Sequence, residues 1–187
     1  MLWLIAGLGN PGLMYRFSRH NIGFWAIDLI SKRMGIALSQ KSHQALWGEG
    51  RMGRIPVILS KPQTFMNISG LSVQSLASAK DIDTSHLVVI HDDMDLPPGG
   101  IKIRTRGGSG GHKGVQSVID HLGRDDFLRI RIGTGHPGPE EDATGFVLSP
   151  PTPAELDALQ PVIHSTELMI TAIINDGPHA AMNLFNR

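Results

Sequence analysis

Residues 87–90 (LVVI) form an unbroken apolar run that is rich in β-branched side chains. A run of this kind favours a strand covered on both faces, as in the parallel sheets of α/β proteins. Its carboxyl end carries His91, Asp92, Asp93 and Asp95. Because ligands of open α/β sheets bind beyond the carboxyl ends of the strands, these side chains are candidates for chemistry. The plainer alternative is a solvated acidic loop.

The next residues add a positive strand and a glycine-rich loop. PPGG at residues 97–100 predicts a turn, and in IKIRTR at residues 101–106 every second residue is a cation. Such a strand places Lys102, Arg104 and Arg106 on one face. GGSGGHKG then leads into a helical pattern over residues 115–122. Secondary structure alone does not explain why acids, cations and this loop are adjacent, so we predict a functional site here.

The chain begins with a predicted buried strand over residues 2–6, followed by GLGNPG. These glycines match the G-x-G-x-x-G spacing of dinucleotide-binding proteins, but the helical pattern starts only near Asn21 and ends at residues 34–35. A nicotinamide site is therefore weakly supported. His20 lies in the loop between strand and helix, and it shares a crevice with Asp92 if the two strands are parallel neighbours.

Further elements follow from pattern and capping signals. Residues 47–52 and 55–61 are expected to form a hairpin, and Ser69 is expected to cap a helix over residues 71–79. Residues 127–133 alternate as a strand that offers Arg129 and Arg131 to one side.

The C-terminal part is predicted to be mainly helical. Residues 136–142 form an acidic loop, and Thr152 with Glu155 gives a capping box. The helix that begins there should bend or break near Pro161 and end at residues 177–178.

Length and composition fit one domain in the cytoplasm. The 187 residues are 41% hydrophobic, enough for a sizeable core, and no apolar run approaches the ~20 residues of a membrane span. Cysteine is absent, which excludes disulfides and thiolate nucleophiles. The formal net charge of zero hides an asymmetry: residues 1–134 carry sixteen cations and ten acids, and residues 135–187 carry one and seven. A local basic patch can therefore bind phosphate.

Several motifs, in order along the chain, resemble the bacterial-type peptidyl-tRNA hydrolase family. They are GLGNPG, Tyr15, RHNIG at residues 19–23, KPQTFMNISG at residues 61–70, the stretch 87–114 and RIRIG at residues 129–133. The resemblance extends to about Leu148. It implies a single α/β domain, residues 1–187, with a twisted mixed sheet flanked by helices. It also implies hydrolysis of the ester between a peptide and the terminal ribose of tRNA, which recycles tRNA from abandoned translation products.

The resemblance assigns a role to each matching residue. His20 corresponds to the general base that activates water, and Asp92 to the carboxylate that orients it. Histidine is the side chain best suited to take a proton near neutral pH. Asn10 and Asn67 correspond to amides that hold the substrate and the developing oxyanion.

The remaining matches are binding positions. Substrate-binding positions are Tyr15, Met66, Asn67, His112 and Lys113. Positions that bind tRNA phosphates are Lys102, Arg104 and Arg131, where cations suit the ligand. No metal, cofactor or membrane is implied, and a monomer is expected.

One departure leaves alternatives open. Lys113 follows His112 where the family usually has asparagine, and an ammonium only donates hydrogen bonds. A second hypothesis is therefore a hydrolase-like protein that binds RNA with little or no turnover. A third is a metal hydrolase that uses His91, Asp92, Asp93 and His112, although their spacing matches no recognised ligand pattern.

Overall fold

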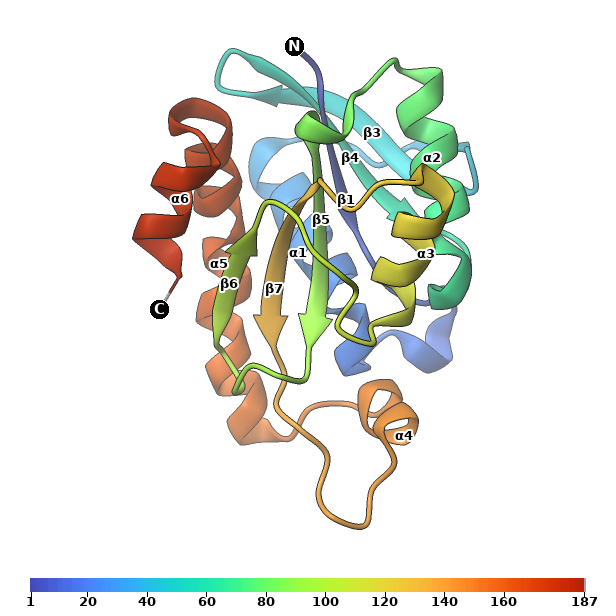
Figure 1. Cartoon of the computed structure of the whole chain (residues 1–187), viewed down its shortest axis with the longest axis vertical. Coiled ribbons are helices and arrows are strands. Elements are labelled where there is room, and N and C mark those ends of the chain that lie inside the picture. The colour runs from blue at the N-terminus through green and yellow to red at the C-terminus, as the bar shows by residue number, and fades with distance from the viewer. Residues whose placement is uncertain (187) are drawn as a thin grey trace.

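The apolar runs of the sequence form one seven-stranded sheet in the computed structural model, which describes residues 1–186 (Figure 1). The strands are β1 (Trp3–Gly7), β2 (Gln40–Ser42), β3 (Ala45–Met52), β4 (Ile55–Pro62), β5 (Leu87–Asp93), β6 (Ile101–Arg104) and β7 (Leu128–Gly133). Their order across the sheet is β2-β3-β4-β1-β5-β7-β6. The four inner strands are parallel, whereas β2, β3 and β6 join through antiparallel pairs. The predicted mixed sheet is confirmed.

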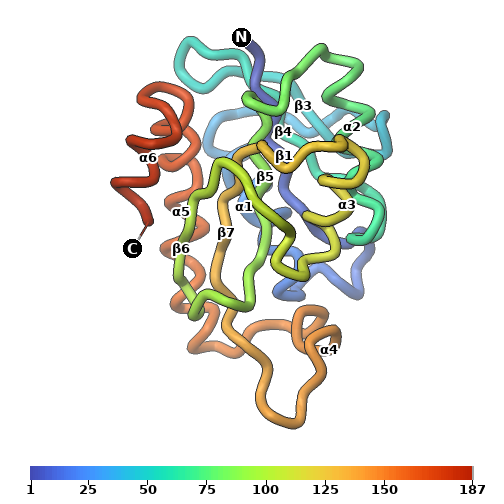
Figure 2. Tube along the Cα trace, viewed as in Figure 1, coloured from blue at the N-terminus to red at the C-terminus, as the bar shows by residue number. Residues whose placement is uncertain are grey.

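Helices cover both faces of this sheet (Figures 1 and 2). They are α1 (Ile22–Met34), α2 (Ser69–Ala79), α3 (Lys113–Leu122), α4 (Ala143–Leu148), α5 (Pro153–Asp176) and α6 (Pro178–Phe185). One hydrophobic core lies between the sheet and α1, α5 and α6, and the other between the sheet and α2 and α3. Strand β5 contributes Val88 and Ile90 to the first core and Leu87 and Val89 to the second, as its composition predicts.

Glycines at the end of β1 and at the start of α1 allow these two elements to pack closely. A Cβ atom on Gly7 would collide with the carbonyl oxygen of Gly23, and one on Gly23 would collide with the backbone of Leu8. The start of α1 therefore lies directly against the end of β1, which only glycine permits. A Cβ atom on Gly9 would in turn collide with the ring of Phe24, so packing against α1 explains the G-x-G spacing without a dinucleotide.

Two local predictions are wrong. Ser69 is the first residue of α2, its hydroxyl accepts no capping hydrogen bond, and the 3-10 turn η3 (Met66–Ile68) leads into the helix instead. The second is the break at Pro161, since α5 continues through this residue; the alternative of a bend there stays a prediction. The capping box of Thr152 and Glu155 and the end of α5 before Gly177 are confirmed.

Three short elements were not predicted, namely β2, α4 and α6. All three residues of β2 are exposed, and α4 has only six residues. Periodicity cannot identify such short segments. The predicted domain end, Arg187, lies outside the described residues. No helix within residues 1–186 has the length and apolar character needed to cross a bilayer.

Candidate active site

The parallel strands bring their carboxyl ends to one edge of the sheet, and a cavity of about 440 Å³ lies there. The segments that follow β1, β4 and β5 line it, together with the glycine loop before α3, Arg131 of β7 and one side of α4. The predicted functional stretch and the loop after β1 therefore meet in space. All predicted catalytic and substrate-binding residues line this cavity: Asn10, Tyr15, His20, Met66, Asn67, Asp92, His112 and Lys113.

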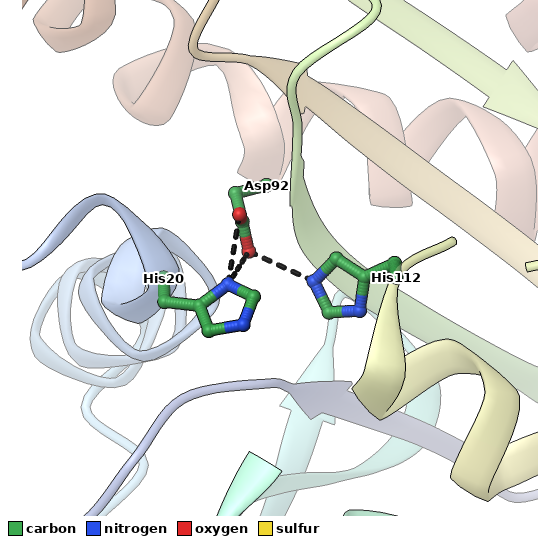
Figure 3. Close-up of side chains that lie close together, drawn as sticks. All are labelled: His20, Asp92 and His112. Carbon is green, nitrogen blue, oxygen red and sulfur yellow. Dashed lines mark hydrogen bonds and ion pairs between the residues drawn. The ribbon is translucent and has the colours of Figure 1, made fainter. Parts of the chain in front are cut away.

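His20 and Asp92 are hydrogen-bonded although 72 residues separate them. His20 lies in the 3-10 turn η2 (Arg19–Asn21), and its Nδ1 is 2.8 Å from both carboxylate oxygens of Asp92 (Figure 3). A carboxylate only accepts hydrogen bonds, so Nδ1 carries the proton and Nε2 is left with a lone pair. Both residues are buried, with exposed fractions of 9% and 1%. The predicted juxtaposition follows from the pairing of β1 with β5.

His112 forms a second hydrogen bond to the same carboxylate. Its Nε2 is 2.9 Å from Oδ1 of Asp92 (Figure 3). Its Nδ1 accepts from the backbone N–H groups of Gly114 and Val115. His112 is thus the N-cap of α3. An Nδ1 that accepts cannot carry a proton, so the proton of the neutral ring is on Nε2 and is donated to Asp92.

The environment keeps Asp92 ionised. Burial alone would raise the pKa of Asp92, but the imidazoles of His20 and His112 and their hydrogen bonds outweigh it. The net result is a pKa well below the usual range of a carboxyl. Asp92 is therefore a fixed negative charge beside His20, as an orienting carboxylate requires.

His91 faces the same region but is held neutral. Its Nδ1 donates to the carbonyl oxygen of Asp92 at 2.7 Å, and the side chain is buried. Burial, followed by the nearby His112, places the pKa of His91 well below its ordinary value. Since Asp93 is paired with Arg131, the four residues of the metal-hydrolase hypothesis do not form one ligand set.

Another group of ligand atoms lies close together. Atoms of His20, Asp92 and His112 are within 4.8 Å of one another. A metal would need the lone pair of Nε2 of His112, but that nitrogen carries the proton that Nδ1 cannot take. The donor set in this arrangement does not suit a cation.

Asn10 is oriented by two residues that hold its backbone and its side chain. Its Oδ1 accepts from the N–H of Met66 at 2.7 Å, so the amide oxygen is occupied and the NH₂ group is the end left to serve a ligand. The backbone of Asn10 is bonded to the side chain of Asn21 in both directions, at 2.8 and 3.0 Å. Sequence reasoning identified Asn21 only as a helix start and missed this role.

Asn67 and Tyr15 are polar residues of the cavity lining. Asn67 is exposed in η3, and its side chain has no hydrogen-bond partner within residues 1–186. Tyr15 contacts Phe65 edge to face, with ring centroids 6.5 Å apart. Phe65 lines the cavity with 57% of its surface exposed, and it was not among the predicted site residues. Met66, by contrast, is buried.

The predicted phosphate-binding cations share the face of β6 and β7. Lys102 is paired in register with Arg131, and Arg104 with Arg129. Arg131 forms an ion pair with Asp93, whereas Lys102 and Arg104 have no salt bridge within residues 1–186. Arg129 lies on the same face as Arg131, as predicted, but it is not available to a ligand. Its guanidinium is buried and donates to the carbonyl oxygens of Gly108 and Asp125, at 2.7 and 2.9 Å, which secures the glycine loop.

The chain is similar in sequence and fold to known proteins. A sequence model of the family described as "Peptidyl-tRNA hydrolase" matches residues 4–187. Peptidyl-tRNA hydrolase from Koribacter versatilis is 44% identical over 98% of this chain and 92% of the relative. The one from Carboxydothermus hydrogenoformans is 42% identical over 100% and 99%. The crystal structure of peptidyl-tRNA hydrolase from Acinetobacter baumannii superposes with a TM-score of 0.94 at 34% identity, over 99% of this chain and 94% of that one.

Proposed function

Because this chain belongs to the peptidyl-tRNA hydrolase family and hydrolyses the ester that joins a peptide to tRNA, we propose that His20 is the general base of this reaction. The observation that carries the proposal is the buried hydrogen bond between His20 and Asp92 in the lining of the 440 Å³ cavity. A protein that only binds RNA has no use for such a base, so the alternative without turnover is not favoured.

The geometry supports a sequence of proton transfers through one nitrogen. Nε2 of His20 accepts a proton from water, and the water oxygen attacks the carbonyl carbon of the ester. Asp92 stabilises the imidazolium through Nδ1–H. When the intermediate collapses, Nε2–H returns the proton to the departing ribose oxygen. The products are a peptide carboxylic acid and tRNA with a free hydroxyl, and His20 is regenerated.

Amide donors stabilise the negative oxygen of the intermediate. The NH₂ group of Asn10 is available because Met66 occupies its amide oxygen, and Asn67 is exposed at the cavity. Donors held in place before the reaction lower the barrier without reorganisation. Tyr15, Met66 and His112 shape the cavity around the peptide, and the exposed Lys113 at the start of α3 donates to a peptide or phosphate oxygen.

The tRNA lies along the cations of β6 and β7. Lys102 and Arg104 project from β6, and Arg131 joins this stripe to the cavity. Arg131 retains free N–H donors although it is paired with Asp93, because a guanidinium has five donors. Point charges and arginine forks of this kind suit backbone phosphates.

We also propose that the reaction needs no metal. The protein acts as a monomer in the cytoplasm, and residues 1–187 form one domain. The proton on Nε2 of His112 supports a reaction without metal, because a protonated nitrogen cannot be a metal ligand together with His20 and Asp92. Retained activity after treatment with a chelator, and a single species of about 20.3 kDa by light scattering, are the expected results.

Replacement of His20 by alanine tests the assignment of the base. His20→Ala should lower kcat by about 10²- to 10⁴-fold, the usual contribution of a positioned base, while tRNA binding is retained. The measurements are single-turnover hydrolysis of purified peptidyl-tRNA and a tRNA binding titration. His43→Ala is the matched control, since His43 is bonded to Ser75 and does not line the cavity. Loss of binding with unchanged kcat would contradict the role.

A further inference from the structure

Arg19 is a buried cation immediately before His20 in η2, and the reaction described above does not use it. Its side chain is only 5% exposed. Nη2 donates to Glu155 at 2.7 Å, and Nη1 donates to the hydroxyl of Ser149 at 2.6 Å and to the carbonyl oxygen of Phe146 at 3.1 Å. Nearly all contacts of this guanidinium are with residues more than 120 positions away.

These contacts hold the C-terminal end of α4. The guanidinium lies over the ring of Phe146 at 4.0 Å, and the backbone N–H of Arg19 donates to the carbonyl oxygen of Ser149. Helix α4 in turn forms one wall of the cavity, through Ala143, Thr144, Val147 and Leu148. Arg19, the residue before His20, is thus hydrogen-bonded to the helix that lines the cavity.

The first turn of α4 is exposed, whereas Phe146 and Val147 nearer its C-terminal end are buried. Residues 138–145, which lead into the helix and form its first turn, are exposed. Within residues 1–186, no side chain other than that of Arg19 joins α4 to η2 by a hydrogen bond. The position of this wall therefore depends on its C-terminal end, where Arg19 binds.

Glu155 completes the connection to α5. One of its oxygens accepts both from Arg19 and from the backbone N–H of Thr152, within the capping box. Burial alone would raise the pKa of Glu155, but hydrogen bonds from Thr152 and Arg19 outweigh it and lower the pKa. Buried ion pairs seldom stabilise a fold better than apolar residues of the same volume do, so stability alone is a weak reason for this one.

We propose that Arg19 is a positioning residue that couples the α4 wall of the cavity to the turn carrying His20. When the peptide part of the substrate contacts α4, the Arg19 link also orients the side chain of His20. The apolar side chains of Val147 and Leu148 suit the peptide rather than the phosphates of tRNA. This inference rests on the proposed function, since it takes His20 as the base.

The test compares Arg19→Gln and Arg19→Lys with the wild-type enzyme on two substrates, an N-acetylaminoacyl-tRNA and a tRNA bearing a longer peptide. Arg19→Gln should raise KM for the longer peptide about tenfold or more, because one partner of a buried charge pair is left unpaired. The rise should be smaller for the short substrate, and the affinity for deacylated tRNA should be unchanged. Arg19→Lys keeps the charge beside Glu155 and should recover part of the loss.

Arg33→Gln is the matched control. Arg33 also joins α1 to α5, by donating to the carbonyl oxygen of His164 at 2.7 Å, but it does not line the cavity. Its replacement should leave both KM values unchanged. An Arg19→Gln enzyme that folds and has wild-type KM values for both substrates would overturn the proposal.

Two further measurements keep the result decisive. If Arg19→Gln does not fold, Glu155→Gln removes the ion pair and keeps an oxygen that can accept from Thr152. Hydrogen exchange should then be about tenfold faster or more at the amides of α4 and unchanged in α3, which reports coupling without any turnover. An inactive wild-type enzyme would refute the proposed function, whereas unchanged exchange in α4 and wild-type KM in Glu155→Gln would refute the coupling.

Discussion

Asp92 accepts hydrogen bonds from two imidazoles that differ in how many of their ring nitrogens have a hydrogen-bond partner. His112 uses Nδ1 to cap α3, so both of its ring nitrogens are occupied. His20 uses only Nδ1, and its Nε2 has no hydrogen-bond partner within residues 1–186. Of the two rings, only that of His20 can therefore accept a proton from water without the loss of an existing hydrogen bond.

The depressed pKa of Asp92 links stability to pH. The folded state keeps this carboxyl ionised below its ordinary value of 3.8, so the unfolded state binds its proton first as pH falls. The stabilisation is present above the unfolded pKa and is lost as pH falls through the lower folded pKa. The free energy of unfolding of the wild-type protein should therefore decrease as pH falls below about 4, and less steeply in Asp92→Asn.

Urea unfolding at a series of pH values measures this difference. Asp120→Asn is the control for a change of net charge, because Asp120 is exposed and bonded only to Gln116. The same replacement at Asp92 should also lower kcat by about 100-fold or more, since the base loses the charge that supports its imidazolium. Equal pH slopes for Asp92→Asn and the wild type would contradict the assigned stabilisation.

At the scale of elements, the cations of β6 and β7 differ in burial and in the partners they bind. Arg129 is buried and secures the glycine loop, while Lys102 and Arg104 are partly exposed. Alternation placed these residues on one face correctly, but it could not show which of them had backbone carbonyls within reach. That depends on where the loop at Gly108 returns to the sheet.

Removal of one exposed cation should weaken tRNA binding and its salt dependence together. Lys102→Ala should reduce the slope of log Kd against log salt by about one, because one fewer counterion is released. Lys80→Ala is the control, since Lys80 pairs with Glu49 of β3, which lies toward the opposite edge of the sheet from β6. A binding titration at several salt concentrations gives the slope, and an unaltered slope for Lys102→Ala would remove this residue from the interface.

Long elements with a clear period were predictable, and short ones were not. The hairpin of β3 and β4, helix α1 and the fully buried β5 all follow patterns that span several residues. Helix α4 depends instead on one cap, Asp142, and on distant contacts with Arg19. Ser69 does not cap a helix and Pro161 does not end one, although each residue type has that tendency. Packing in the surrounding structure outweighs these tendencies, which are worth about 1 to 3 kcal/mol.

At the scale of the whole molecule, one sheet joins two hydrophobic cores. Phe127 is fully buried in the core beneath α2 and α3, and Trp25 packs against the core on the other side. A destabilising substitution in either core should therefore lower the free energy of unfolding of the whole domain.

Phe127→Ala tests this unity. The replacement should lower the free energy of unfolding by about 3 to 5 kcal/mol, the usual cost of a cavity left by a phenylalanine. Circular dichroism and tryptophan fluorescence should still report one coincident transition. Phe17→Ala, at a side chain that is 66% exposed, should cost about 0.5 kcal/mol or less. Two separate transitions would show that the cores unfold independently.

The sequence by itself determined the class of fold and the family, and it supplied the residues that we propose for the chemistry, because these depend on local patterns and on motifs that can be read in order. It also suggested that His20 and Asp92 meet, through the rule that parallel strands end at one edge. Only the tertiary structure decided the tautomer of His112, the burial of Arg129 and the roles of Asn21 and Arg19. Each of these depends on hydrogen-bond partners brought together by strand pairing and helix packing, and no pattern of neighbouring residues specifies such partners.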